Sequence, residues 1–324
     1  MTESSLLSVK ELRVLHAGPY GEEALVHGVS FEVSPRQTVA IVGESGSGKS
    51  LSALAIMRLT GPGMRVTAET LRLGTVDILS LRESELRDIR GERIAIVFQN
   101  PMSSLNPVLS VGHQLTQAIR AHERLDRRRA RERAVELLAL VEVPEPHRRF
   151  EQYPFELSGG TLQRVTIAMA LSAQPDLLIA DEPTTALDAT LQAQIMELLK
   201  KRQGDLGMGL LLISHDLAVV AHAADEVVVM YGGRVVEHGD VRSVFHGPLH
   251  PYTRALLATV KEMSSDDDGE LHPIPGLPPR LDRLPVGCPF APRCPMAVER
   301  CRVEPPSLDA AREGHEVACH RWDE

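Results

Sequence analysis

Four short apolar runs punctuate the chain between residues 38 and 213. They occupy residues 38–42, 94–98, 177–180 and 210–213 and consist almost entirely of Val, Ile, Leu and Ala. Runs of this length without polar alternation are typical of fully buried strands. Together with the helices expected between them, these strands predict an α/β fold.

Alternation and β-branched content predict further strands at residues 7–15 and 29–33, separated by a Gly/Pro turn at 17–21. Residues 69–79 are also expected to form strands. Residues 83–90 are predicted to form a short polar helix.

Helical periodicity dominates the middle of the chain. Residues 108–152 are predicted to be helical, with one apolar face that comprises Ala130, Ala134, Leu137, Leu138 and Val141. The opposite face carries the arginines Arg127, Arg128, Arg129, Arg131 and Arg133. Such a face could contact anionic lipid or nucleic acid, but a solvated helix surface is the favoured interpretation. Further helices are expected at 51–58, 161–173 and 189–202.

Composition narrows the function classes. The 324 residues are 43% hydrophobic, which is ordinary for a globular protein and leaves room for one large domain with an appendage, or for two domains. A net charge of −9 argues against nucleic acid as the main partner. The first residues, MTESSLLSVKEL, do not read as a signal peptide, and no stretch predicts a membrane span, so we expect membrane association through partners.

The strongest motif is GESGSGKS, at residues 43–50. It matches the P-loop pattern G-x-x-x-x-G-K-[ST] and lies between a predicted strand and a predicted helix. Its glycines let backbone N–H groups point at phosphate oxygens, and the helix start adds a positive dipole end. We expect Lys49 to reach the β- and γ-phosphates and the Ser50 hydroxyl to ligate Mg²⁺. The motif predicts a nucleoside triphosphate site formed by Gly43, Glu44, Ser45, Gly46, Ser47, Gly48, Lys49 and Ser50.

Polar residues follow three of the apolar strands. Gln99 directly follows the 94–98 run, and its amide oxygen is a candidate ligand of Mg²⁺ or water. Asp181 and Glu182 follow the 177–180 run in a Walker B arrangement, where Asp181 would hold Mg²⁺ and Glu182 would polarise the attacking water. His215 follows the 210–213 run and is a candidate contact for the γ-phosphate.

The tetrapeptide LSGG at 157–160 opens a predicted helix. Ser158, Gly159 and Gly160 at a helix start form a second anion-binding terminus. The Walker B residues follow some twenty positions later.

These motifs in this order resemble the ATP-binding cassette (ABC) ATPases over roughly residues 7–240: the P-loop, Gln99, LSGG, Walker B, Asp188 and His215. The segments 98–107 and 250–257 resemble those of the peptide/nickel importer subfamily. The resemblance implies a P-loop ABC ATPase fold with a RecA-like core, an antiparallel β subdomain and a helical subdomain near 101–170. It also implies an ATPase domain over 1–260 and a Cys-rich C-terminal region over 261–324.

The resemblance further implies a pair of cassettes with two ATP molecules between them. Ser158, Gly159, Gly160 and Asp188 would then serve the composite nucleotide sites. The partners implied are a second, related ABC ATPase in a heterodimer, two permease subunits and, through them, an extracytoplasmic substrate-binding protein. The location implied is the cytoplasmic face of the cell membrane.

Two positions depart from the family pattern. Thr161 follows the signature where the family usually has Gln and the subfamily often Met. The adenine-stacking aromatic is missing from its usual place, and His16 and Tyr20 are both candidates.

All four cysteines, Cys288, Cys294, Cys301 and Cys319, fall within the last 37 residues. A proline-rich linker is expected before them, over 261–285. The spacing is not that of a structural zinc finger, whereas four thiolates suit a [4Fe–4S] cluster, which the resemblance also implies. Zinc, with His315 or His320 as further ligands, and free or oxidised thiols remain alternatives.

Three other functions fit the sequence less well than that of a peptide importer ATPase. A cassette ATPase acting on DNA or ribosomes is disfavoured by the acidic charge, the single cassette and the short 106-residue interval between Ser50 and Leu157. A redox sensor with a degenerate ATPase is disfavoured because the ATPase residues are intact: Lys49, Asp181, Glu182 and His215. Import of nickel or a metal chelate is the runner-up.

Overall fold

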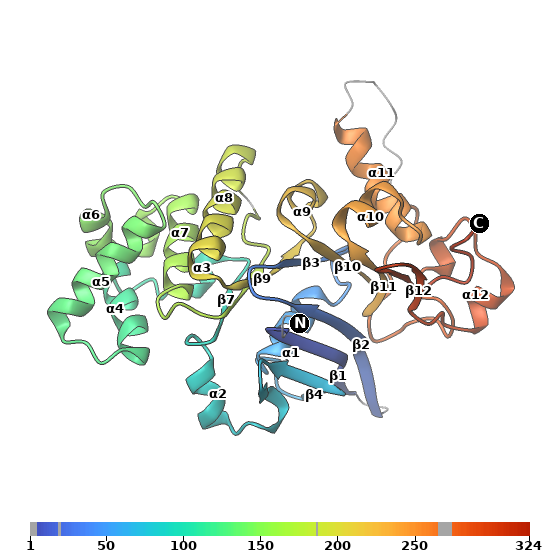
Figure 1. Ribbon diagram of the computed structural model, residues 1–324, viewed down its shortest axis with the longest axis horizontal. Helices are drawn as coiled ribbons and strands as arrows, with labels where there is room; N and C mark the ends of the chain where they lie inside the picture. Colours follow the sequence, from blue (N-terminus) through green and yellow to red (C-terminus); the bar gives the residue numbers. More distant parts are fainter. Residues whose placement is uncertain (1–4, 19–20, 186, 265–273) are drawn as a thin grey trace. The chain divides into compact units, whose positions relative to one another are not determined.

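The computed structural model describes residues 5–18, 21–185, 187–264 and 274–324 (Figure 1). The chain forms two compact units. Unit 1 contains Met1–Val33, Thr38–Leu79 and Leu212–Glu324, and unit 2 contains Ser34–Gln37 and Ser80–Leu211. The strand β9 (Gly209–Ser214) begins in unit 2 and ends in unit 1.

The first sheet of unit 1 is antiparallel and is built around β1. Its strands run in the order β2-β1-β5-β6, and β4 also pairs with β1. The bounds are β1 Leu7–Gly18, β2 Gly21–Val33, β4 Met64–Thr67, β5 Thr70–Leu73 and β6 Val76–Asp77. Both long strands extend further towards the Gly/Pro turn than the sequence predicts.

Local alternation explains which face of β1 is buried. Leu7 and Val9 point into the core, and so do Leu12 and Val14, although the two pairs are out of phase. The register shifts between Val9 and Leu12, where Glu11 adopts a positive φ of 54°. This irregularity lets both pairs face the same core.

Five strands of a second, larger sheet belong wholly to unit 1 and have the order β12-β13-β11-β10-β3. They are β3 Thr38–Val42, β10 Glu226–Tyr231, β11 Arg234–Asp240, β12 Asp309–Arg312 and β13 His315–Val317. β3 and β10 are parallel, and the other pairs are antiparallel. All five residues of β3 are buried, as its uninterrupted apolar run predicts.

The α-helices of unit 1 include α1 Lys49–Ile56, α9 Leu217–Ala223, α10 Val241–His246, α11 Pro251–Ser264 and α12 Glu299–Val303. Two short 3₁₀ helices are η1 Ile78–Ser80 and η3 Ala291–Arg293. The last residue of η1, Ser80, is the first of the main segment of unit 2. The predicted linker over 261–285 is wrong at its start, because residues 261–264 belong to α11. Within the described part of that linker, residues 274–285 carry no helix or strand, and residues 265–273 lie outside the described residues.

Unit 2 combines a parallel strand pair with helices. Its elements are β7 Ile94–Val97, β8 Leu177–Asp181, α2 Glu83–Ile89, α3 Pro101–Ser104, α4 Val111–His122, α5 Arg127–Leu140, α6 Pro146–Glu151, η2 Pro154–Glu156, α7 Gly159–Ala170 and α8 Ala189–Leu206. The helices α4, α5, α6 and α7, green to yellow-green in Figure 1, pack against one another.

The helical character predicted for residues 108–152 is confirmed, and it is divided among three helices, α4, α5 and α6. Ser110 caps α4 by accepting from the His113 N–H, and Asp126 caps α5 by accepting from the Arg129 N–H. The apolar face of α5 is confirmed, with Ala130, Ala134, Leu137 and Leu138 buried and Val141 buried at its C-cap. The opposite arginines are exposed or ion-paired, for example Arg128 with Glu132 at 3.0 Å.

Candidate functional site

The predicted P-loop connects β3 to α1 in unit 1, which is the strand–loop–helix context that the motif requires. Gly43 adopts φ 149°, and a Cβ atom there would lie only 2.2 Å from the Met230 carbonyl oxygen. Gly48 precedes α1 with φ 99°. Only glycine permits this course of the backbone.

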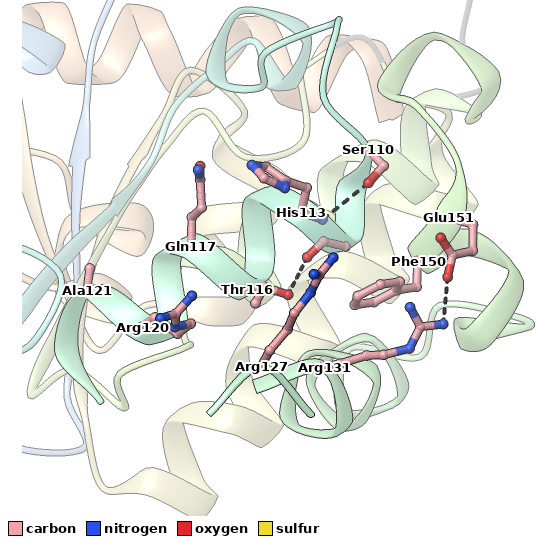
Figure 2. Close-up of a pocket in the computed structure, with 11 residues that line it drawn as sticks. Ser110, His113, Thr116, Gln117, Arg120, Ala121, Arg127, Arg131, Phe150 and Glu151 are labelled. Carbon is pink, nitrogen blue, oxygen red and sulfur yellow. Dashed lines mark hydrogen bonds and ion pairs between the residues drawn. The ribbon is translucent and has the colours of Figure 1, made fainter. Parts of the chain in front are cut away.

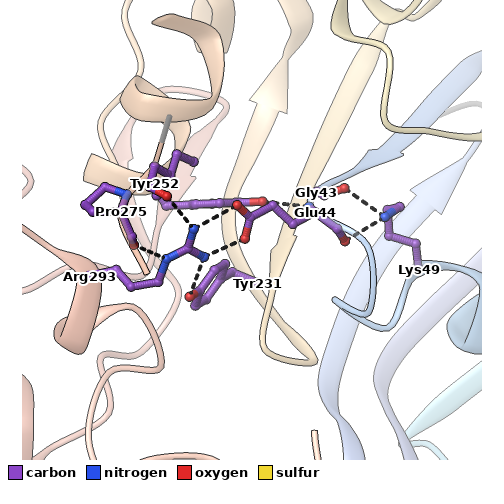
Figure 3. A network of polar contacts seen from close by, with 8 residues as sticks. Gly43, Glu44, Lys49, Tyr231, Tyr252, Pro275 and Arg293 are labelled. Carbon is purple, nitrogen blue, oxygen red and sulfur yellow. Dashed lines mark hydrogen bonds and ion pairs between the residues drawn. The ribbon is translucent and has the colours of Figure 1, made fainter. Parts of the chain in front are cut away.

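Lys49 is buried and turns back along the loop. Its Nζ donates to the carbonyl oxygens of Gly43, at 2.8 Å, and Glu44, at 2.9 Å (Figure 3). The ammonium group is thereby held within the loop, where it can meet a polyphosphate.

The remaining loop residues leave a polar group for a ligand. Ser45 and Gly46 are exposed, whereas Ser47 is buried. The Ser47 hydroxyl has no hydrogen-bond partner among the described residues. A phosphate oxygen would supply that partner, so the loop fits the triphosphate predicted for it. Ser50 follows Lys49 in the first turn of α1.

The parallel strands β7 and β8 bring the predicted polar residues of unit 2 together. Val97 pairs with Ala180, so the two strands end side by side. Gln99 Nε2 donates to Glu182 Oε2 at 2.6 Å. The adjacent Asp181, the last residue of β8, is buried.

Glu182 is held in an unusual conformation. Its φ is 47°, in the left-handed region that costs a side-chain-bearing residue roughly 1–2 kcal/mol. Thr185 compensates by donating from Oγ1 to Glu182 Oε2 at 2.9 Å, and its N–H donates to the Glu182 carbonyl at 3.2 Å. Strain that is kept by surrounding bonds is typical of functional positions.

The signature residues begin α7 as predicted. Ser158 is the N-cap and accepts from the Thr161 N–H, and its hydroxyl lies 2.9 Å from the Thr161 hydroxyl. Ser158 and Gly159 are exposed, whereas Gly160 is buried. Asp188 is the exposed N-cap of α8.

The remaining candidates lie in unit 1. His215 is exposed between β9 and Asp216, the N-cap of α9. His16 belongs to β1, opposite Glu23 and Met64, and is half-buried. Tyr20, the alternative adenine-stacking residue, lies outside the described residues.

Two residues that sequence reasoning missed contact the P-loop directly. The Tyr252 hydroxyl accepts from the Glu44 N–H at 2.7 Å, and Arg293 forms an ion pair with the Glu44 carboxylate. Tyr252 belongs to the subfamily segment 250–257, which gave no indication of this contact. Nothing in the sequence singles out Arg293 among the other arginines.

The four cysteine thiols are free and line one small apolar cavity of about 20 Å³. Burial raises the pKa of Cys288 to about 11 and also raises the pKa values of Cys294 and Cys319. Four thiol donors around one cavity fit an iron–sulfur cluster chemically. However, no three His, Cys, Asp or Glu side chains of the described part of the chain are arranged to hold a metal ion. The structure therefore does not support the predicted metal-binding extension.

Unit 2 contains a larger hollow of about 770 Å³ beside α4, α5 and α6 (Figure 2). His113, Arg120 and Arg127 line it. Arg131 bonds to Glu151 at 2.5 Å and lies 4.4 Å from the centroid of the Phe150 ring. This hollow is basic and open.

Comparisons with known proteins agree with the motifs. The sequence profile described as ABC transporter matches residues 26–185, and the one described as oligopeptide/dipeptide transporter, C-terminal region, matches residues 236–301. A putative peptide import ATP-binding protein of Brucella melitensis is 48% identical, over 100% of this chain and 99% of its own. The dipeptide transport ATP-binding protein DppD of Escherichia coli is 47% identical, over 98% of this chain and 96% of its own.

The fold is similar to that of a solved ABC protein. The dimeric ATP-binding cassette MJ0796, in a post-hydrolysis state bound to ADP and Pi, superimposes with a TM-score of 0.66. It is 28% identical and covers 73% of this chain and 99% of its own. The predicted ABC ATPase cassette fold, with its mixed α/β content, is confirmed. None of the helices that the structure describes has the length and apolar content needed to cross a bilayer. The chain belongs to the ATP-binding subunits of ABC transporters, in the group that includes the dipeptide and oligopeptide transport ATP-binding proteins.

Proposed function

We propose that this chain hydrolyses ATP to power the import of dipeptides or oligopeptides through a membrane transporter. The observation that carries the proposal is the identity of 47–48% with peptide-transport ATP-binding proteins along the whole chain. The match to the oligopeptide/dipeptide C-terminal profile supports it further.

The ATP site is proposed to contain the eight P-loop residues that the sequence predicts. Mg²⁺, held by Ser50, Gln99 and Asp181, would offset the negative charge of the phosphates. Glu182 orients and polarises the attacking water, and His215 contacts the γ-phosphate. Support comes from Lys49 within the loop, from the buried Ser47 hydroxyl and from the Gln99–Glu182 contact.

The site is proposed to be completed by a second cassette. Ser158 and Gly159 are exposed at the start of α7, where a helix terminus can bind an anion. They would contact the ATP held by the partner, together with Gly160 and Asp188. The dimeric state of MJ0796 supports this arrangement. By resemblance, the partner is a related but different ATPase.

Permease subunits are proposed to dock on unit 2. Of the ten large hydrophobic side chains that are exposed among the described residues, five lie within residues 98–155. They are Phe98, Met102, Val108, Tyr153 and Phe155. Tyr153 and Phe155 stack on each other with ring centroids 5.6 Å apart, and adjoining exposed apolar side chains favour a protein–protein interface. We further propose that the chain lies on the cytoplasmic face of the membrane and assembles with two permease subunits. A substrate-binding protein would act through these permeases from the other side of the membrane.

The domain boundaries remain those predicted from sequence. We propose an ATPase domain over 1–260, with a RecA-like core, an antiparallel β subdomain and a helical subdomain near 101–170. A C-terminal region over 261–324 follows.

A [4Fe–4S] cluster is proposed for the four cysteines, with zinc as the alternative. The support for this proposal is the all-thiol donor set. Anaerobically purified protein should be brown, and Cys294→Ser should remove the colour. Met296→Leu, at another residue that lines the cavity, should keep it. A colourless protein loaded with zinc would contradict the cluster.

Uptake measurements in a strain lacking the gene test the transport function. We expect the parent gene to restore uptake of a labelled dipeptide or oligopeptide and Lys49→Ala to fail, with nickel uptake equal in all strains. Loss of nickel uptake with normal peptide uptake would favour the runner-up function.

A further inference from the structure

Arg293 lies in the C-terminal part of unit 1, yet its side chain is directed at the P-loop (Figure 3). Only 6% of the side chain is exposed. Nη1 and Nη2 donate to the two Glu44 carboxylate oxygens, at 2.6 and 3.0 Å. A two-pronged bond of this kind fixes both orientation and distance.

The other N–H groups of the guanidinium are also used. Nε donates to the Pro275 carbonyl at 2.8 Å, Nη1 to the Tyr231 hydroxyl at 3.1 Å and Nη2 to the Ile274 carbonyl at 3.2 Å. With the two bonds to Glu44, all five donors have an acceptor. Lysine cannot reproduce this geometry.

Glu44 is held by three of its own groups. Its carboxylate pairs with Arg293, its N–H donates to the Tyr252 hydroxyl, and its carbonyl accepts from Lys49 Nζ. The residue that precedes it is Gly43, whose carbonyl accepts from the same lysine. The first turn of the P-loop is therefore tied to Arg293 and to the P-loop lysine at once.

An aromatic cluster supports the arginine. The ring centroids of Tyr231, Tyr252 and Phe290 lie 4.6 to 5.4 Å from one another. Phe290 is the N-cap of η3, the short helix that ends at Arg293. The segment is thus packed, and the arginine approaches Glu44 from a defined position.

We propose that Arg293 is a positioning residue of the ATP site, which neutralises Glu44 and fixes the P-loop so that the loop can accept a triphosphate. The C-terminal segment between Cys288 and Cys294 is then a structural part of the nucleotide site. This inference rests on the proposed ATP site at residues 43–50.

The reason is electrostatic. A triphosphate brings several negative charges to the loop that also carries the Glu44 carboxylate. Removing Arg293 leaves this carboxylate, whose side chain is only 23% exposed, without its cationic partner. The triphosphate is then repelled by the unpaired Glu44 carboxylate, which has the same sign of charge. The affinity for ATP therefore falls first, and the hydrolysis step is not the step directly affected.

The test measures Mg-ATP affinity on the full chain by equilibrium binding of a fluorescent ATP analogue, with thermal melts alongside. Arg293→Ala should raise Kd about tenfold, or about 1.4 kcal/mol. Arg293→Lys should fall between parent and Arg293→Ala. Adding Glu44→Gln to Arg293→Ala should restore most of the affinity, because the uncompensated charge is gone. Arg300→Ala, which removes an exposed ion pair with Glu304 in the same region, should leave Kd unchanged.

The outcomes separate two failures. If the parent chain does not bind Mg-ATP, the proposed ATP site is wrong. If the parent binds and folded Arg293→Ala binds equally well, the positioning role is wrong. Should Arg293→Ala not fold, Arg293→Lys and the double variant decide the matter. Parent-like affinity in Arg293→Lys, or no recovery in the double variant, overturns the inference.

Discussion

Gln99 donates a 2.6 Å hydrogen bond from its side-chain amide to the carboxylate of Glu182. The same carboxylate oxygen accepts from the Thr185 hydroxyl. Two donors on one oxygen leave the carboxylate little freedom to rotate. The relationship follows from the parallel register of β7 and β8, which ends both strands at one edge.

Thr185→Val tests whether this restraint matters for hydrolysis. The variant removes one of the two bonds at nearly constant volume, so kcat should fall about threefold to tenfold with KM for ATP little changed. Thr185→Ser keeps the hydroxyl and should retain most of the activity. Steady-state ATPase assays on the assembled transporter make the comparison, and a normal kcat for Thr185→Val would show that the bond is dispensable.

The P-loop glycines are predicted to differ in their tolerance of alanine. At Gly43 a Cβ would lie 2.2 Å from a backbone oxygen, so Gly43→Ala must move the loop or β10. At Gly46 no heavy atom of the described residues outside its immediate neighbours lies within 4 Å of the added Cβ, and the cost is the positive φ alone, about 1 kcal/mol. We expect Gly43→Ala to abolish ATP binding and Gly46→Ala only to weaken it. Equal affinities, measured by equilibrium binding, would contradict the geometry.

Because His250 is buried, we expect the free energy of unfolding to depend on pH. The His250 Nδ1 accepts from the Tyr252 N–H, and burial lowers the pKa of His250 to about 3 from an ordinary 6.5. The folded state therefore keeps it neutral, while the unfolded chain takes up a proton below pH 6.5. Its contribution to the free energy of unfolding is full above pH 6.5 and declines as pH falls towards 3, by up to about 1.4 kcal/mol per pH unit.

His250→Asn supplies the control, because its amide oxygen can accept the same N–H without titrating. Denaturant unfolding at a series of pH values should give a flatter acid limb for this variant than for the parent. His27, whose pKa burial lowers to about 4, titrates in both proteins and cancels in the difference. Parallel pH profiles would show that His250 is not the titrating group.

Much of the nucleotide-binding architecture was predictable from the sequence. The apolar runs at 38–42, 94–98 and 177–180 correspond to β3, β7 and β8, because fully buried strands need no polar alternation. The caps at Ser158 and Asp188 also lie where their residue types suggest. Buried strands and helix caps depend on residues close together in the sequence, so the local pattern is sufficient to predict them.

Other features depend on contacts between distant residues. The pairing of Arg293 with Glu44 joins positions 249 residues apart, and no local pattern marks either partner. The breaks between α4, α5 and α6, at residues 123–126 and 141–145, depend on the Asp126 cap and on the turn before Pro146, which the spacing of apolar positions does not report. The grouping of all four cysteines in the last 37 residues predicted a metal site, but closeness in sequence does not report the arrangement of the sulfur atoms.

We propose that Glu182 polarises the attacking water for hydrolysis at a site completed by a second cassette. The most direct measurement compares ATP binding and turnover of the parent and Glu182→Gln, each assembled with the partner ATPase and permeases, and of the parent chain alone. We predict efficient turnover only in the parent assembly. Glu182→Gln should bind Mg-ATP normally while kcat falls about 10²–10³-fold, or about 3–4 kcal/mol. Near-normal hydrolysis by the Glu182→Gln assembly would exclude this role of Glu182, and full activity of the chain alone would exclude the need for a second cassette.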